Sequence, residues 1–242
     1  MVVGRKEVSP GDFLMEVYTR LYNHFGPRHW WPAETPFEVV VGAILTQSVA
    51  WRNVEKAIAN LKEAGLLSVE GLHQAEVEEI ASLIVPTRYY RAKAKKLKAF
   101  INFLVEKYGG SLARLFTEPL AKLRPELLGL NGIGPETADS ILLYAGEYPI
   151  FVIDAYTHRI FQRLGVFEPK VSYAEMQRFF MYHLPTDVKL FNEYHALIDA
   201  LGNRLCRARK PTCQECPLLG LGCQVSKDGN LKTESLTVLP ER

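Results

Sequence analysis

Apolar residues recur three and four positions apart through most of this 242-residue chain, with polar residues between them. That spacing is typical of amphipathic helices, each with one apolar face. No pair of short alternating segments suggests a β-hairpin, and no internal repeat is visible. The pattern therefore predicts an all-α fold. Helices are expected at residues 11–26, 51–64, 74–84, 91–108, 111–117, 119–128, 155–164, 173–183 and 188–205.

Residues 36–48 (PFEVVVGAILTQS) differ because they are apolar on almost every side. A run of this kind is either a central buried helix or a buried strand, and its three consecutive valines suit a strand. We predict a buried helix, with the strand as the alternative.

A glycine-rich turn follows the helix predicted to end at Leu128. Gly132 and Gly134 flank Ile133, and Pro135 suits the first turn of the next helix. Glycines without a Cβ allow close approach of another surface, and the N–H groups at a helix start favour a phosphate. An ordinary helix–turn–helix corner would have the same pattern. The turn is therefore a candidate phosphate site, with a structural corner as the alternative.

A single carboxylate, Asp154, ends the apolar run Pro149–Ile153, twenty residues after Gly134. An aspartate here can cap the helix predicted to begin at Ala155. It can also be a catalytic carboxylate. The two roles are compatible, and the pairing with a phosphate site suggests chemistry on DNA.

Composition narrows the class of protein without naming a ligand. Hydrophobic residues make up 48% and charged residues 23%, as in ordinary soluble domains. The net charge is only +2, so a DNA-binding face would have to be a local basic surface. No apolar run approaches the roughly 20 residues of a membrane span, and no signal peptide is recognisable. We expect a cytoplasmic monomer without a membrane partner, associated with the nucleoid if prokaryotic.

Four cysteines, Cys206, Cys213, Cys216 and Cys223, are confined to a stretch of 18 residues. In a cytosolic chain such crowding indicates metal or cluster ligands rather than disulfides. Structural zinc sites usually combine two close cysteine pairs, whereas here only one pair is close. The spacing therefore favours a [4Fe–4S] cluster with a structural role, and zinc is the alternative.

Several motifs together resemble the endonuclease III, or helix-hairpin-helix (HhH-GPD), superfamily of DNA glycosylases. They are LTQ at Leu45–Gln47, TRYYRAKAKKL at Thr87–Leu97, LxGIGxxTA at the glycine turn, Asp154 and the four cysteines. The resemblance covers about residues 10–225 and implies two helical domains with a cleft between them. Residues 32–154 would form a six-helix domain ending in the hairpin and Asp154. Residues 1–31 and 155–226 would form the second domain with the cluster loop, followed by a polar tail at 227–242.

The resemblance also implies a mechanism on double-stranded DNA with a damaged base. Such enzymes flip one nucleotide out of the duplex and cleave its N-glycosidic bond, with Asp154 as the catalytic carboxylate. Members that also cut the DNA backbone carry a lysine two residues after the second glycine. Glu136 occupies that position here, and a carboxylate cannot form an imine. We therefore expect a monofunctional enzyme with weak or absent AP-lyase activity.

Tryptophans are the candidates for recognising the base. Trp30, Trp31 and Pro32 form one loop, and Trp51 lies four residues after Gln47. Tryptophans are often core residues, but stacked indoles also attract a positively charged base. The pattern is similar to that of 3-methyladenine glycosylases in the superfamily, which favours alkylated purines. The alternatives are an endonuclease III-like enzyme for oxidised pyrimidines and a non-catalytic helix-hairpin-helix DNA-binding protein.

Further DNA contacts follow from the same resemblance. Hairpin amides would bind a phosphate, a glutamine would fill the gap left by the flipped nucleotide, and an exposed side chain would wedge the opposite strand. Gly132, Gly134 and Thr137 would bind the phosphate. Gln47 would fill the gap, and Arg88 or Tyr89 would be the wedge. The helix after this wedge is basic. Lys93, Lys95 and Lys96 would add charge toward the DNA backbone, although a solvated helix face is their more common role.

Overall fold

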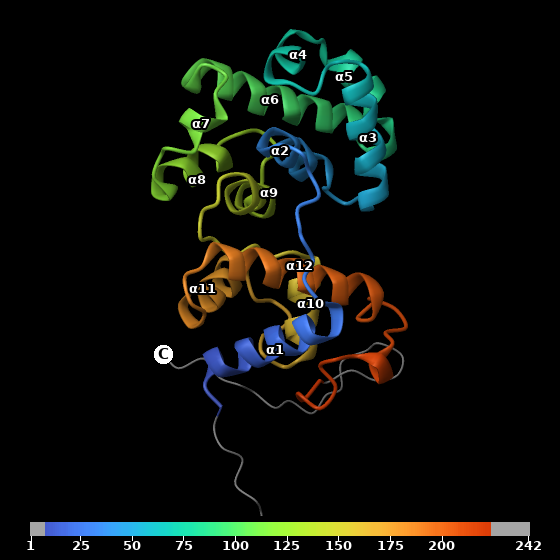
Figure 1. The fold of residues 1–242 in the computed structure, drawn as a ribbon, viewed down its shortest axis with the longest axis vertical. Helices are drawn as coiled ribbons and strands as arrows, with labels where there is room; N and C mark the ends of the chain where they lie inside the picture. The colour runs from blue at the N-terminus through green and yellow to red at the C-terminus, as the bar shows by residue number, and fades with distance from the viewer. Residues whose placement is uncertain (1–7, 224–242) are drawn as a thin grey trace, which may run out of the picture. The chain divides into compact units, whose positions relative to one another are not determined.

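The computed structural model describes residues 8–223, so the predicted polar tail at 227–242 lies outside the described residues. The chain divides into two compact units, shown in Figure 1. Unit 1 combines residues 1–30 with 149–242, and unit 2 comprises residues 31–148. Residues 8–223 contain helices and no β-strand, which confirms the all-α prediction. No helix in this part of the chain is both long and apolar enough to cross a membrane.

Unit 2 contains most of the helical segments. They are α2 (Pro36–Leu45), α3 (Trp51–Glu63), α4 (Val69–Gln74), α5 (Val77–Leu83), a 3₁₀ turn η1 (Val85–Thr87), α6 (Tyr90–Tyr108), α7 (Leu112–Leu115), α8 (Leu120–Leu128), α9 (Pro135–Ser140) and a π-helical turn η2 (Ile141–Ala145). The structure divides this region into the eight α-helices α2 to α9, and the short helix α4 was not among those predicted from the spacing.

The apolar segment at the centre of unit 2 is the helix α2, so the strand alternative was wrong. Thr35 caps it by accepting a hydrogen bond from the Glu38 amide, and Pro36 occupies the first turn. Residues 38–45 are all buried. Helices α3, α6 and α9 and the turn η2 pack against α2. Burial on every side explains why this helix lacks a polar face.

Unit 1 is built from α1 (Pro10–Phe25), α10 (Ala155–Arg163), α11 (Tyr173–His183) and α12 (Val188–Arg204), with a 3₁₀ turn η3 (Cys213–Glu215). Helix α12 packs against α1 and α10, and α1 also contacts α11. Aromatic rings fill the core, where the ring of Phe151 stacks on that of Phe180 with centroids 4.3 Å apart.

The observed boundaries differ from the predicted domains 32–154 and 1–31 plus 155–226. They fall after Trp30 and after Tyr148, so Asp154 belongs to unit 1 rather than to the end of the six-helix domain. The reason is the extended segment before Asp154. Phe151 is fully buried among the aromatic rings of unit 1, and its carbonyl accepts a 2.7 Å hydrogen bond from Gln177 Nε2 on α11.

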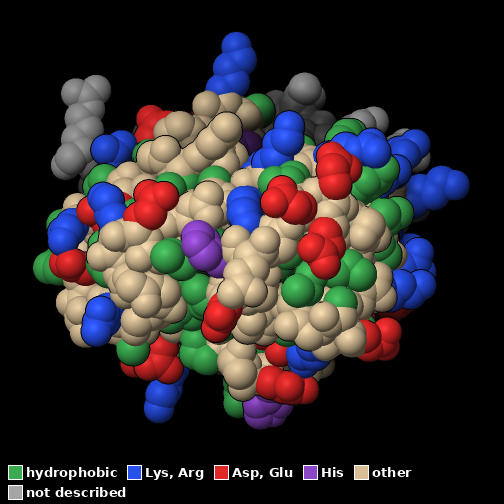
Figure 2. Space-filling view, turned by 90° about the horizontal axis from the view of Figure 1, so that it is seen from above, with side chains coloured by type: hydrophobic (Ala, Val, Ile, Leu, Met, Phe, Trp, Pro, Cys, Tyr) green, Lys and Arg blue, Asp and Glu red, His purple; other side chains and the backbone are tan. Residues whose placement is uncertain are grey.

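Charge is mixed on the face of the molecule seen in Figure 2, which looks onto the α4–α6 end of unit 2. Acidic and basic side chains are interspersed there, and neither sign forms a dominant patch on this face. This agrees with the low net charge of +2. A polyanion would find no strong attractive field on this particular face.

Candidate functional site

The predicted hairpin is present between α8 and α9 in unit 2. A bidentate ion pair joins the two helices, with Arg124 Nε and Nη2 donating to the two carboxylate oxygens of Asp139 at 2.7 and 3.0 Å. Asp139 is fully buried. Within the turn, the amide of Ile133 donates to the carbonyl of Leu130 at 3.1 Å. The hairpin is thus anchored on a buried charge pair, which holds its two helices together.

Gly132 and Gly134 have different structural reasons for being glycine. Gly132 has φ +84°, in the left-handed region, and a Cβ there would meet the Lys96 side chain at 2.5 Å. Gly134 is the N-cap of α9, with no side-chain cap and open space where a Cβ would stand. The start of α9 is therefore sterically accessible to a ligand at Gly134.

Gln47, predicted to fill the gap in DNA, is joined to the hairpin by hydrogen bonds. Its Nε2 donates to the Thr137 hydroxyl at 2.8 Å and to the Gly132 carbonyl at 3.2 Å. Its Oε1 accepts a hydrogen bond from Lys96 Nζ. Thr137 is buried, so its hydroxyl serves this contact inside unit 2. The structure thereby brings together three of the predicted DNA-contact residues.

The predicted wedge residues lie at an exposed corner before α6. Arg88 and Tyr89 both have positive φ, of 55° and 45°, and the Tyr89 ring is 74% exposed. Two consecutive non-glycine residues in this region of backbone space are unusual and form a sharp, strained turn. The turn presents both side chains to solvent.

Lys93 does not lie on a solvated helix face and cannot reach a DNA backbone in this conformation. It is 2% exposed, and its ammonium donates to the carbonyls of Leu45 at 2.7 Å and Thr87 at 2.6 Å. Burial and, to a smaller extent, the positive charge of Lys96 together lower the pKa of Lys93 to about 8. The sequence prediction failed for Lys93 because α6 turns this position toward α2 and η1.

Aromatic side chains gather in unit 2 beside α2. The rings of Trp31 and Trp51 meet edge to face with centroids 5.3 Å apart. Tyr144 approaches Trp31 with ring centroids 5.2 Å apart and was missed from the sequence. A Cβ on Gly42 would lie 3.1 Å from Trp31 Nε1, so this glycine of α2 makes room for the indole. We call Trp31, Trp51 and Tyr144 the aromatic cluster.

Trp30 and Pro32 are the other two residues predicted for the base pocket. Trp30 is assigned to unit 1, and Pro32 is exposed. Tyr144 stands on the π-helical turn η2, and such turns occur frequently at functional sites. Nothing in the helical spacing predicted a π-helical turn, which explains why Tyr144 was overlooked.

Asp154 is the N-cap of α10, as one of its two predicted roles required. Its Oδ1 accepts hydrogen bonds from both the amide and the hydroxyl of Thr157, each at 2.7 Å. Its Oδ2 lies 3.7 Å from His195 Nε2. The cap therefore uses one carboxylate oxygen and leaves the other directed toward α12.

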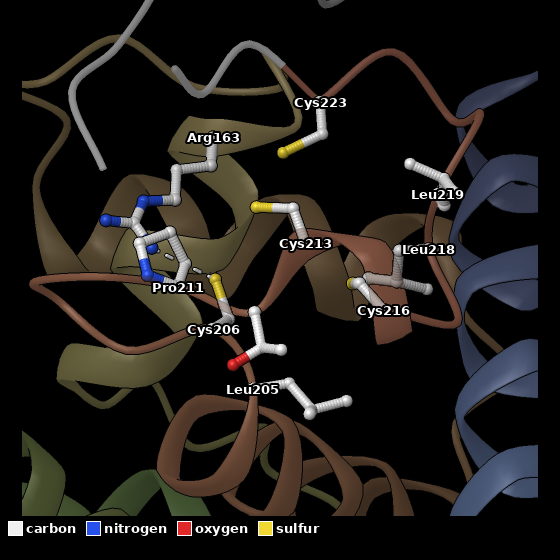
Figure 3. Close-up of a pocket in the computed structure, with 10 residues that line it drawn as sticks. Arg163, Leu205, Cys206, Pro211, Cys213, Cys216, Leu218, Leu219 and Cys223 are labelled. Atoms are coloured by element: carbon white, nitrogen blue, oxygen red, sulfur yellow. Dashed lines mark hydrogen bonds between the residues drawn. The ribbon is translucent and has the colours of Figure 1, made fainter. Parts of the chain in front are cut away.

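The four cysteines line one pocket at the end of unit 1. In Figure 3 the sulfur atoms of Cys206, Cys213 and Cys223 face the same space. Arg163 Nη1 donates to Cys206 Sγ at 3.3 Å, and its guanidinium also binds the carbonyls of Arg207 and Ala208. Among the described residues, no group of three or more potential ligands is arranged to hold a metal ion.

The four cysteines nevertheless have surroundings that suit a metal ion or cluster bound through their thiolates. All four are in one loop, and the positive charge of Arg163 beside Cys206 would offset thiolate charge. Burial raises the pKa of the Cys216 thiol, with the Cys206 and Cys213 side chains adding to the rise. Binding a metal at neutral pH would therefore release a proton from Cys216.

Comparisons with known proteins agree on one family. The family described as HhH-GPD superfamily base excision DNA repair protein matches residues 41–185. A relative from Methanocaldococcus jannaschii, provisionally named a DNA repair glycosylase, is 45% identical over 86% of this chain and 94% of its own. Endonuclease III of Thermotoga maritima is 32% identical over 75% of this chain and 79% of its own.

A solved structure shares the fold. The 3-methyladenine DNA glycosylase of H. pylori, solved bound to 1,N6-ethenoadenine, has a TM-score of 0.71 and 25% identity, covering 81% of this chain and 98% of that one. The hairpin, the carboxylate at the start of α10 and these matches lead to one conclusion: the chain belongs to the HhH-GPD superfamily of base excision DNA repair proteins.

Proposed function

We propose that this protein is a monofunctional DNA glycosylase that removes alkylated purines such as 3-methyladenine. The observation that carries the proposal is the aromatic cluster of Trp31, Trp51 and Tyr144, supported by Glu136 at the hairpin position where lyases of the family need a lysine. The H. pylori 3-methyladenine DNA glycosylase supports the same substrate class through its similar fold.

Base recognition would use the electron-rich faces of the aromatic cluster. A methylated purine such as 3-methyladenine carries positive charge, and aromatic faces attract cations by about 0.5–2 kcal/mol each. Gly42 leaves space for the Trp31 indole at this place. Positive charge also weakens the N-glycosidic bond, so such a base needs little acid catalysis to leave.

DNA binding would begin at the hairpin. The accessible start of α9 at Gly134 would hold a backbone phosphate through its amides. Arg88 and the exposed Tyr89 ring would wedge the strand opposite the lesion. Gln47 would fill the gap left by the flipped nucleotide, after giving up its hydrogen bonds to Thr137 and Lys96.

Bond cleavage would depend on Asp154. As the N-glycosidic bond breaks, its electron pair leaves with the base and the sugar becomes cationic at C1′. The ionised Asp154 carboxylate would stabilise that cation and accept a proton from the water molecule that attacks C1′. Glu136 cannot form an imine with C1′, so the product would be an intact abasic strand.

The cysteine loop would hold a [4Fe–4S] cluster, with Cys206, Cys213, Cys216 and Cys223 as ligands and zinc as the alternative. When bound, the group would act as a structural crosslink of the loop. Arg163 of α10 already joins this loop through Cys206 Sγ and two carbonyls. We propose no redox step for it.

A panel of duplexes, each with one lesion, tests this function. We expect base release from duplexes containing 3-methyladenine or 1,N6-ethenoadenine, with strand breaks only after alkali. Breaks without alkali, or a borohydride-trapped adduct, would contradict the monofunctional assignment. Release of oxidised pyrimidines alone would favour the endonuclease III-like alternative, which the 32% identity to the Thermotoga maritima enzyme supports. Binding without any base release would indicate a non-catalytic DNA-binding protein.

A further inference from the structure

A polar row on α12 faces the N-terminal half of α10 within unit 1. His195, Asp199 and Asn203 are spaced four residues apart, which places them on one face of the helix. The row begins at Asp154, whose Oδ2 is 3.7 Å from His195 Nε2. It ends at Tyr156, whose hydroxyl donates to Asn203 Oδ1 at 2.8 Å. The row therefore connects the capping carboxylate of α10 to α12.

The Asp154–His195 pair is shielded from water. The side chain of His195 is 10% exposed and that of Asp154 is 13% exposed. Coulomb interactions between such groups are screened less than those on an open surface. Because Thr157 occupies only Oδ1, the oxygen left for chemistry is the one that faces the imidazole. The imidazole of His195 is thus well placed to act on Asp154.

A second carboxylate, that of Asp199, interacts with both Asp154 and His195. Burial raises the pKa of Asp199, and the negative charge of Asp154 raises it further. His195 and the hydrogen bonds from Asn203 act in the opposite direction. Asp154 therefore disfavours ionisation of Asp199, and His195 favours it.

Other charged groups near this row come from the segment after α1 and from α10. Arg28, in the segment after α1, favours ionisation of Asp199, and the Arg28 amide itself donates to the Glu193 carboxylate. On α10, the Arg159 guanidinium lies over the Tyr156 ring at 4.9 Å, and burial raises the pKa of Tyr156. None of these contacts replaces an imidazole beside Oδ2 of Asp154.

We propose that His195 is a positioning residue for Asp154. Its imidazole lies beside Oδ2, the carboxylate oxygen that the helix cap leaves unused, and holds that side of Asp154 in place for the reaction. This inference rests on the proposed glycosylase function, because it assigns His195 a role beside the catalytic carboxylate.

The test is the pH dependence of single-turnover base release by His195→Asn, on the lesion that the wild type removes. An asparagine cannot become positively charged. Loss of an opposite charge near a carboxylate changes its pKa by about 1–3 units. We therefore expect the acid limb of the rate profile to move to higher pH by about one unit or more. His195→Gln, which fills more of the imidazole volume, repeats the measurement if the first variant unfolds.

Two controls separate positioning from a purely structural role. His158→Asn makes the same change on α10, where Nε2 of His158 lies 3.2 Å from the Val171 carbonyl and away from Oδ2 of Asp154. This variant should keep the wild-type profile. Adding Asp199→Asn to His195→Asn removes the repelling carboxylate and should move the acid limb back toward lower pH. If the effect of His195→Asn came only from lost packing, adding Asp199→Asn would not reverse it.

The outcomes distinguish the inference from the function beneath it. Base release with an unchanged acid limb in both His195 variants would overturn the role of His195 and leave the proposed function intact. No base release by the wild type from any duplex would overturn the proposed function, and the positioning role with it.

Discussion

At the scale of single residues, Asp154 shows how one side chain can serve both fold and chemistry. It caps α10 through Oδ1 while Oδ2 points toward His195. Helix caps are commonly aspartate, so a cap by itself says nothing about catalysis. The two roles separate when the charge is removed and the cap is kept, because asparagine caps helices about as well as aspartate does.

We therefore predict that Asp154→Asn will keep the thermal stability of the protein within a few degrees of the wild type. Base release should fall by about 10²-fold or more, as expected for loss of a catalytic carboxylate. Asp187→Asn is the matched control, since Asp187 caps α12 by accepting from the Leu190 amide at 2.8 Å. Single-turnover kinetics check both variants. Equal rates in Asp154→Asn and the wild type would remove Asp154 from the mechanism.

Lys93 illustrates the opposite case, a charged residue whose role is internal. Its ammonium holds the carbonyl of Leu45, before Gln47, and that of Thr87, before the Arg88–Tyr89 turn. Two loops with proposed DNA contacts thus share one buried donor. A neutral amine still has two N–H groups, so both hydrogen bonds can survive loss of the proton.

The pKa of Lys93, lowered to about 8, predicts a pH dependence of stability. Between about pH 8 and the ordinary lysine pKa of about 10.4, the unfolded chain keeps a proton that the folded protein has lost. The free energy of unfolding relative to Lys93→Met should therefore rise with pH in this window. Urea unfolding at several pH values measures the difference. Lys95→Met, on the exposed side of α6, is the control and should show no such trend.

At the scale of elements, the hairpin depends on the Arg124–Asp139 pair that joins α8 to α9. Local signals explain the turn, since Gly132 supplies the positive φ and Pro135 begins α9. They do not explain the angle at which the two helices meet. That angle is held by a bidentate pair in which Asp139 is fully buried. Removing one partner of such a pair is costly.

Arg124→Met should lower the free energy of unfolding of unit 2 by about 3 kcal/mol, because it removes the cationic partner of a buried carboxylate. Arg91→Met is the matched control. Its partner Glu78 is on the surface, with side chains 67% and 71% exposed, so the change should stay below about 1 kcal/mol. Urea denaturation compares the two. Similar losses of unfolding free energy in both variants would show that the Arg124–Asp139 pair stabilises the protein no more than a surface ion pair does.

At the scale of the whole molecule, the cysteine loop extends the α10–α12 packing of unit 1. Arg159 donates to the carbonyls of Cys206 and Gly202, and Arg163 binds Cys206 Sγ and the following loop. A group that crosslinks the four thiols would therefore stabilise the C-terminal end of α12 and the last turn of α10. Helix α1 also packs against α12 and contacts the cysteine loop, where Arg20 Nη1 donates to the Leu219 carbonyl at 3.1 Å.

We predict that the native protein contains iron and sulfide, and that Cys213→Ser loses both together with the broad absorbance in the violet region. Hydrogen exchange should become faster at the ends of α10 and α12, while α2 and α6 of unit 2 remain protected. Elemental analysis after anaerobic purification provides the check. Zinc without iron would establish the alternative metal, and full protection in Cys213→Ser would contradict the crosslinking role.

Sequence alone determined the features that depend on neighbouring residues. Helical spacing predicted nearly every long helix, and the prolines and glycines located the hairpin and the helix ends. The family followed from the hairpin, Asp154 and the cysteine spacing together, and the comparisons confirmed it. These signals are readable because a helix, a cap or a tight turn is stabilised by contacts within about four residues.

Only the tertiary structure decided which distant residues meet. It placed residues 149–154 in unit 1, turned Lys93 inward, brought Tyr144 to Trp31 and set His195 beside Asp154. None of these contacts has a local signature, because each depends on how whole helices pack and on which side chains fill the space between them. The chemistry proposed for Asp154 therefore begins in the sequence, but its surroundings were set by the packing of α10 on α12.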